Sequence, residues 1–245
     1  EIMPSLVGSE MCIRDRAYEF DRVVYLSNYL TPHIDSVGDI ELLRSVFRAC
    51  MGRRIQLLYI AGPAGAEGAA DAAGRTGKGI IAHAANDLCR YYAARDGVQT
   101  KILRVPFLYT ASAALEDPFL VPLFDACSTG SVALQGAQDA AFPLLCAEEL
   151  AVLVRRIFDS WDGNFETLDV ADAFHHTAGE VGEALQALFP GLSAAYGDSA
   201  GYALPAGDFA RVRYGWFQRY DLLRDLSTIH ARWDAGREKK VNPLR

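Results

Sequence analysis

The chain has 245 residues, of which 51% are hydrophobic and 22% are charged, so it can bury the core of one large domain, or of a domain with a small appended lobe. No stretch reaches the ~18 uncharged apolar residues of a membrane-spanning helix, and a formal net charge of −7 argues against nucleic acid as a partner. None of the five cysteines lies in a metal-binding or Cys-x-x-Cys spacing, which favours a reducing, cytoplasmic setting.

The first residues differ in character from the rest of the chain. Residues 1–16 read EIMPSLVGSEMCIRDR and resemble the translation of a sequencing adapter. They lack the basic segment and the long apolar run of a signal peptide. We expect a non-native or disordered leader here, the alternative being an ordinary frayed N-terminus.

In the first half of the chain, short apolar runs alternate with segments of helical periodicity. Asp39 is the predicted N-cap of the first helix, which Gly52 ends. A second helix is predicted over 80–94. The apolar runs predict strands at 22–27, 55–60 and 101–105. This alternation indicates βαβ units, and therefore a parallel sheet with helices on its faces.

The second half of the chain continues the pattern with longer polar connections. Thr177 and Glu180 have the spacing of a capping box at the start of a helix. The segment 190–207 is rich in Gly, Ala and Ser and predicts a loop. The remaining predicted elements are helices at 148–161, 177–189 and 221–233 and a strand at 163–169.

Three landmarks occur in a fixed order: KILRVPFLY at 101–109, FPLLCAEELA at 142–151 and YGWFQRYDLL at 214–223. Together they resemble the back half of an extended short-chain dehydrogenase/reductase, the NAD-dependent sugar-nucleotide epimerase/dehydratase family. The resemblance spans about 18–235. It implies an α/β fold, a Rossmann-type parallel sheet with a small C-terminal α/β substrate lobe.

The family opens on a glycine-rich strand-turn-helix that this chain lacks, so we expect an N-terminally truncated fragment whose sheet lacks its first strands. The resemblance implies a partial dinucleotide-binding domain at 17–110, holding the family's strands four to six. The substrate-lobe region and C-terminal helices follow at 111–236, and 237–245 is expected to be a loose tail.

The family moves a hydride between NAD(P) and a sugar carbon, and uses a Ser or Thr with a Tyr-x-x-x-Lys pair for proton transfer. By alignment, Pro63 stands in the Ser position, Lys78 in the Tyr position and Ala82 in the Lys position. No Tyr occurs between Tyr59 and Tyr91, so a shift in register does not restore the motif. We therefore expect this fragment to be inactive.

The resemblance implies NAD or NADP as the cofactor of the full-length protein, with none certain for this fragment. A nucleotide-sugar or another small molecule is the expected partner, and the family suggests a homodimer. No arginine lies between Ile157 and Arg211, where the family often has one that binds the pyrophosphate. The implied cofactor-binding residues are Ser27, Asn28, Ala61, Gly62 and Pro106, and the implied substrate residues are Phe107 and Tyr109.

Other motifs carry weaker signals. The run 62–68 fits a G-x-x-G-x-x-G phosphate loop, but no apolar helical face follows it. The run 74–79 has only part of a Walker loop, and the pair His175 and His176 has no matching cluster of metal ligands.

Three functions stay open: a divergent, inactive relative of the family, a non-enzymatic dinucleotide-sensing or regulatory module on the same scaffold, and an enzyme with Lys78 or His83 as a replacement group.

Overall fold

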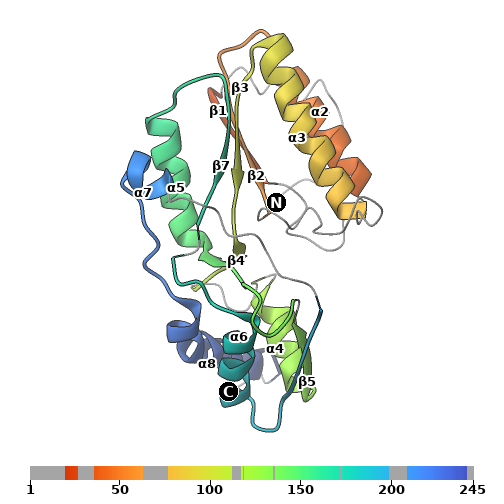
Figure 1. Ribbon diagram of the computed structural model, residues 1–245, viewed down its shortest axis with the longest axis vertical. Coiled ribbons are helices and arrows are strands. Elements are labelled where there is room, and N and C mark those ends of the chain that lie inside the picture. The colour runs from red at the N-terminus through yellow and green to blue at the C-terminus, as the bar shows by residue number, and fades with distance from the viewer. Residues whose placement is uncertain are drawn as a thin grey trace.

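A computed structural model describes residues 20–26, 36–62, 77–111, 117, 119–134, 136–171, 173–198 and 209–241, with the side chains of 36, 37, 77–80 and 238–241 left out. The molecule is elongated, with a sheet and its helices at one end and a smaller lobe at the other (Figure 1). Among the described residues, no helix combines the length and the apolar character needed to cross a membrane.

The main sheet has four described strands, all parallel, in the order β1-β2-β3-β7. Their bounds are Arg22–Leu26 for β1, Gln56–Ala61 for β2, Gln99–Arg104 for β3 and Phe165–Asp169 for β7. All four strands were predicted, and each lies within two residues of its predicted bounds. The α/β class and the parallel sheet are therefore confirmed.

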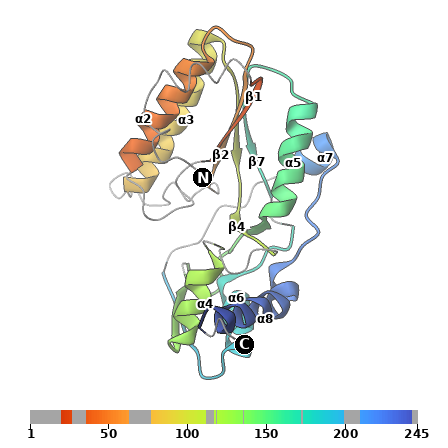
Figure 2. The ribbon, with the colours of Figure 1, turned by 180° about the vertical axis from the view of Figure 1, so that it is seen from behind.

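Helices cover both faces of this sheet, as the two opposite views show (Figures 1 and 2). Leu57 and Tyr59 of β2 pack in the cluster that includes α2 (Ser36–Cys50) and α3 (Gly77–Asp96). Leu58 and Ile60 pack on the other face, in the cluster of α5 (Ala147–Asp159) and α7 (Phe209–Tyr214). Burial on both faces explains why β2 reads as an unbroken apolar run.

The prediction that Asp39 caps the first helix is wrong. Helix α2 begins earlier, at Ser36, so Asp39 lies in its first turn. Asp39 is buried, with 5% of its surface exposed, and its carboxylate accepts a hydrogen bond from the Tyr25 hydroxyl of β1. Burial and this hydrogen bond raise the pKa of Tyr25. Asp39 thus joins α2 to the sheet.

In its described part, the smaller lobe combines three helices with two pairs of short parallel strands. Its core includes Phe124, Leu185 and Trp233. Strand β4 pairs with β6, and β5 pairs with β8. The bounds are Phe107–Tyr109 for β4, Leu120–Ser128 for α4, Ser131–Leu134 for β5, Leu144–Cys146 for β6, Ala178–Leu188 for α6, Ser193–Tyr196 for β8 and Leu222–Val241 for α8.

Two predictions for the lobe need correction and one is confirmed. The segment predicted as a loop contains β8, which exists because it pairs with β5, some sixty residues earlier in the chain. Helix α8 runs to Val241, so residues 237–241 continue a helix where a loose tail was expected. The capping box at α6 is present, because Thr177 and Glu180 each accept the other's backbone N–H.

Candidate functional site

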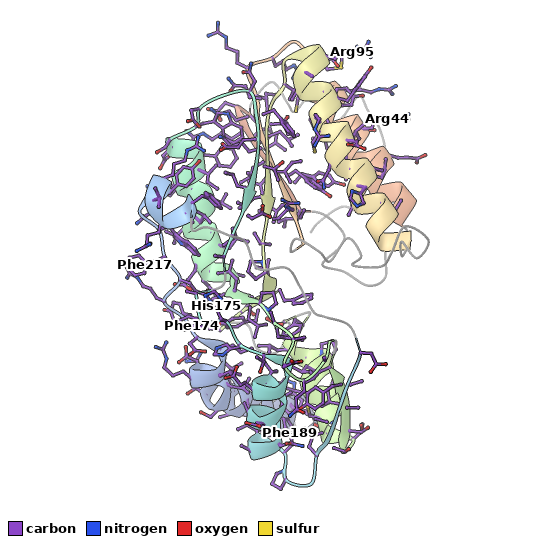
Figure 3. All side chains as sticks on the ribbon, in the orientation of Figure 1. Arg44, Arg95, Phe174, His175, Phe189 and Phe217 are labelled. Carbon is purple, nitrogen blue, oxygen red and sulfur yellow. The ribbon has the colours of Figure 1, made fainter. Side chains whose placement is uncertain are left out.

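The carboxyl ends of the four parallel strands lie at one edge of the sheet, and this edge faces the smaller lobe (Figure 1). Arg95, near the C-terminal end of α3, lies at the end of the molecule away from the lobe (Figure 3). Helix α3 therefore begins at the same edge. Open α/β sheets bind their ligands in the crevice outside the carboxyl ends of the strands, so this edge is the candidate site.

Three of the implied cofactor residues meet at this edge. Ala61 ends β2 and Gly62 follows it, and both are buried. The backbone N–H of Val105 donates to the carbonyl of Ala61 over 3.0 Å, which brings the buried Pro106 to the same place. A methyl group and a glycine leave the backbone open to close approach by a ligand. Ser27, Asn28 and Pro63 lie outside the described residues.

Helix α3 carries the positions aligned with the family's Tyr and Lys. Residues 78 and 82 both belong to this helix, one turn apart, as the motif requires. The side chain of Lys78 is outside the described part, and the methyl group of Ala82 is partly buried. His83 is exposed, and successive helix residues point ~100° apart, so His83 does not share the direction of Ala82.

An ion pair at this edge was missed by the sequence reasoning. Arg104 ends β3 and Asp169 ends β7, and the two residues are register partners. Nη2 of Arg104 donates to Oδ2 of Asp169 over 2.7 Å, and Nε lies 2.6 Å from Oδ1 without the alignment of a hydrogen bond. The charge of the guanidinium is thus paired with the carboxylate at a part-buried position. Only the register of two parallel strands reveals this pair.

The two implied substrate residues lie on β4, at the junction of sheet and lobe. Phe107 packs in an aromatic group with Phe119 and Phe142, at ring-centroid distances of 6.1 and 5.6 Å. Tyr109 is 1% exposed in the lobe core, and its hydroxyl has no hydrogen-bond partner among the described residues. Burial raises the pKa of Tyr109. Tyr109 therefore packs the core and does not present its hydroxyl to a ligand.

The histidine pair lies near the lobe, where Figure 3 labels Phe174 and His175. Nε2 of His176 is 2.7 Å from Oδ1 of Asp221, and its ring stacks on Phe174. In the part of the chain that the structure describes, no three His, Cys, Asp or Glu side chains are grouped to hold a metal ion. His176 instead connects the start of α6 to the start of α8.

No protein-family model and no curated protein matches the chain. Solved structures do match. A dTDP-glucose 4,6-dehydratase from Streptomyces venezuelae, solved with NAD bound, has a TM-score of 0.72 at 10% identity, over 97% of this chain and 80% of that one. A short-chain dehydrogenase/reductase superfamily protein from Agrobacterium tumefaciens with bound NAD has a TM-score of 0.70 at 14% identity, over 96% and 87%.

A UDP-N-acetylglucosamine 4-epimerase from Bacillus cereus has a TM-score of 0.66 at 15% identity, over 91% of this chain and 80% of that one. At identities this low, the structural likeness establishes the fold and leaves the activity open. The chain therefore has the Rossmann-type α/β fold of these solved structures, which are an epimerase, a dehydratase and a short-chain dehydrogenase/reductase superfamily protein.

Proposed function

We propose that the protein is a divergent relative of the sugar-nucleotide epimerases and dehydratases that holds NAD or NADP at the carboxyl edge of its sheet without catalysing turnover. The observation that carries the proposal is the meeting at that edge of Ala61, Gly62 and Pro106, none of which carries a large side chain. It supports binding because backbone and small side chains allow a dinucleotide to approach closely. Neighbours of the same fold were solved with NAD.

We expect no turnover because hydride transfer from a sugar carbon also requires a base that accepts the hydroxyl proton. Oxidation of a sugar carbinol requires a base within hydrogen-bond reach of its hydroxyl. The aligned Tyr position holds Lys78 and the aligned Lys position holds Ala82, which has no ionisable group. The Arg104 guanidinium is already paired with Asp169 and is not a base. A nucleotide-sugar is the proposed second ligand, because related folds were solved with UDP-glucose.

Two measurements on the purified chain test the two halves of the proposal. Calorimetric titration with NAD and with NADP tests binding, and incubation with NAD and UDP-glucose or dTDP-glucose, with products resolved by chromatography, tests turnover. Binding without product is expected. Failure of both dinucleotides to bind refutes the cofactor site, and Ala61→Leu, which adds volume at the edge, controls for binding elsewhere.

Product formation would refute the proposal that the chain does not catalyse turnover. In that case the Lys78→Ala and His83→Ala variants decide which replacement group acts as the base. Loss of turnover with retained dinucleotide affinity in one of them identifies that side chain.

The second candidate is a dinucleotide-sensing or regulatory module on the same scaffold. The part-buried Arg104–Asp169 ion pair favours it, because the pair joins the ends of β3 and β7 at the site and the guanidinium is not a base. A sensor must change elsewhere when the dinucleotide binds. Hydrogen exchange with and without NAD distinguishes the two: altered exchange in the lobe supports a sensor, and altered exchange confined to the sheet edge supports simple binding.

A further inference from the structure

The Arg104–Asp169 ion pair belongs to a row of side chains that crosses the carboxyl edge of the main sheet. Ala61 ends β2 and is the register partner of Arg104, which in turn is the register partner of Asp169. Side chains two residues apart on a strand point to the same face. Tyr59 and Ile102 therefore mark the face of this row, and both pack in the cluster that includes α2 and α3. The ion pair thus lies on the α3 side of the candidate site.

Solvent reaches this ion pair, although the strands that lead to it are buried. Tyr59 and Ile102 are 2% and 1% exposed, whereas the side chains of Arg104 and Asp169 are 25% and 29% exposed. Exposure on this face therefore begins at the carboxyl ends of the strands, where open α/β sheets bind their ligands. Ala61, the neighbour of Arg104 on β2, contributes only a methyl group. The ion pair is thus accessible to a ligand at the edge.

The ion pair uses only part of its hydrogen-bonding capacity. Nη2 of Arg104 donates to Oδ2 of Asp169 over 2.7 Å. Nε of Arg104 and Oδ1 of Asp169 have no hydrogen-bond partner in the part of the chain that the structure describes. A guanidinium has several N–H donors, and a carboxylate accepts through both of its oxygens. Donors and acceptors therefore remain side by side at the candidate site.

The charges of the pair indicate the class of ligand. An anionic group would be attracted by Arg104 and repelled by Asp169, and a cationic group would meet the reverse. A neutral group that both donates and accepts hydrogen bonds avoids this conflict. A hydroxyl is such a group. Of two adjacent hydroxyls, one can accept from the guanidinium while the other donates to the carboxylate.

We propose that the Arg104–Asp169 pair binds two adjacent hydroxyl groups of a sugar ring. This inference rests on the proposed function, and two of its ligands carry such hydroxyls. One source is the ribose of the dinucleotide, and the other is the hexose of a nucleotide-sugar. The pair then serves as a binding contact and takes no part in proton transfer, because the guanidinium is always protonated.

The test is calorimetric titration of the full chain with NAD, with dTDP-glucose and with dTDP. The last ligand has a deoxyribose without adjacent hydroxyls and serves as the reference. Arg104→Met and Asp169→Leu should each weaken binding of the ligand that supplies the hydroxyls about tenfold. Weaker binding of NAD assigns the ribose, and weaker binding of dTDP-glucose assigns the hexose. The affinity for dTDP should stay within about twofold of wild type.

A double variant protects the test against misfolding. Each single change leaves one part-buried charge without its partner, whereas Arg104→Met combined with Asp169→Leu removes both charges together. The double variant should therefore remain folded, as circular dichroism can show, and should still lose the affinity.

The pair of Arg22 and Asp159 is the matched control. Nη1 of Arg22 lies 3.4 Å from Oδ1 of Asp159. Arg22 begins β1, so this ion pair lies at the opposite edge of the sheet from the candidate site. Arg22→Met and Asp159→Leu should leave all three affinities within about twofold of wild type. Equal losses in these control variants would overturn the inference, since binding would then follow the charge of the whole chain.

The remaining outcomes separate this inference from the proposed function. If the wild-type chain binds NAD or dTDP-glucose and the double variant binds them equally well, the inference is wrong and the proposed function stands. If dTDP loses affinity as much as the other ligands do, the pair binds an anionic group and the ligand class is wrong. If the wild-type chain binds none of the three ligands, the proposed function fails and the inference fails with it.

Discussion

Glu149 should contribute far more to stability than its neighbour Glu148, although both are acidic residues in the first turn of α5. Glu149 is 7% exposed, and its carboxylate accepts two backbone N–H groups of the 215–221 segment. Glu148 is exposed and accepts a bond from the Cys146 thiol. The change to Ala at Glu149 therefore leaves two N–H donors without their acceptor.

The expected cost follows from these bonds. A hydrogen bond to a charged group contributes ~1.5–3 kcal/mol, and the lower end applies here because water reaches the exposed Arg219 and Tyr220. Two such bonds give ~3 kcal/mol. Loss of a carboxylate near the helix N-terminus adds ~0.3–1 kcal/mol in both variants. We expect ~3–4 kcal/mol for Glu149→Ala and below ~1 kcal/mol for Glu148→Ala.

Urea unfolding monitored by tryptophan fluorescence measures both free energies, and Trp216 reports locally because its indole donates to the Glu149 carbonyl. Glu149→Gln should fall between the two Ala variants, since the amide keeps one acceptor oxygen and turns its NH₂ toward the second N–H. A Glu149→Ala variant within ~1 kcal/mol of Glu148→Ala would show that the segment does not depend on this carboxylate.

Three further outcomes are expected. In Gly182→Ala the added Cβ would clash with the Tyr196 hydroxyl oxygen, so the free energy of unfolding should fall by ~1–3 kcal/mol, and Tyr196→Phe should restore part of it. An unchanged urea midpoint would contradict this. Burial raises the pKa of the Cys50 and Cys127 thiols to about 11. In a Cys12→Ser variant, iodoacetamide should therefore label these two thiols at neutral pH only after urea has unfolded the protein. Fast labelling of the folded protein would count against their buried positions. Hydrogen bonds from Arg213 and Lys101 lower the pKa of Asp162 from 3.8 to about 2. A carboxyl with a depressed folded pKa stabilises above its unfolded pKa, so this contribution should disappear as pH falls from about 4 to about 2, and an Asp162→Asn variant whose urea midpoints follow the same acid profile as wild type would refute it.

The elements that sequence predicts well are those whose signal is local or continuous. Strand β2 is a buried apolar run, β3 is buried over its four central residues, and the Thr177–Glu180 box is complete within four residues. Asp39 shows the limit of such signals. Its residue type favours the N-cap position, but it lies in the first turn of α2, where its carboxylate accepts a hydrogen bond from Tyr25 of β1. The same limit applies to β8, which forms by pairing with β5.

The candidate site divides in the same way. The family resemblance implied Ala61, Gly62 and Pro106 as cofactor residues, and the structure places all three at one edge because they lie at or after the ends of parallel strands. The Arg104–Asp169 pair was not predicted, because it requires the register between β3 and β7, which are far apart in sequence. The anchoring of the 215–221 segment by Glu149 likewise joins residues about seventy positions apart.

Tyr109 shows how a family resemblance and strand geometry lead to different expectations. The alignment implies substrate contact for both Phe107 and Tyr109, but residues two apart on a strand point to the same side. On β4 that side is the lobe core, where both rings pack, while Leu108 between them packs with the sheet cluster. The sheet edge is thus bordered by backbone, small residues and a neutralised ion pair. This arrangement of the described residues is the basis on which we propose dinucleotide binding at that edge.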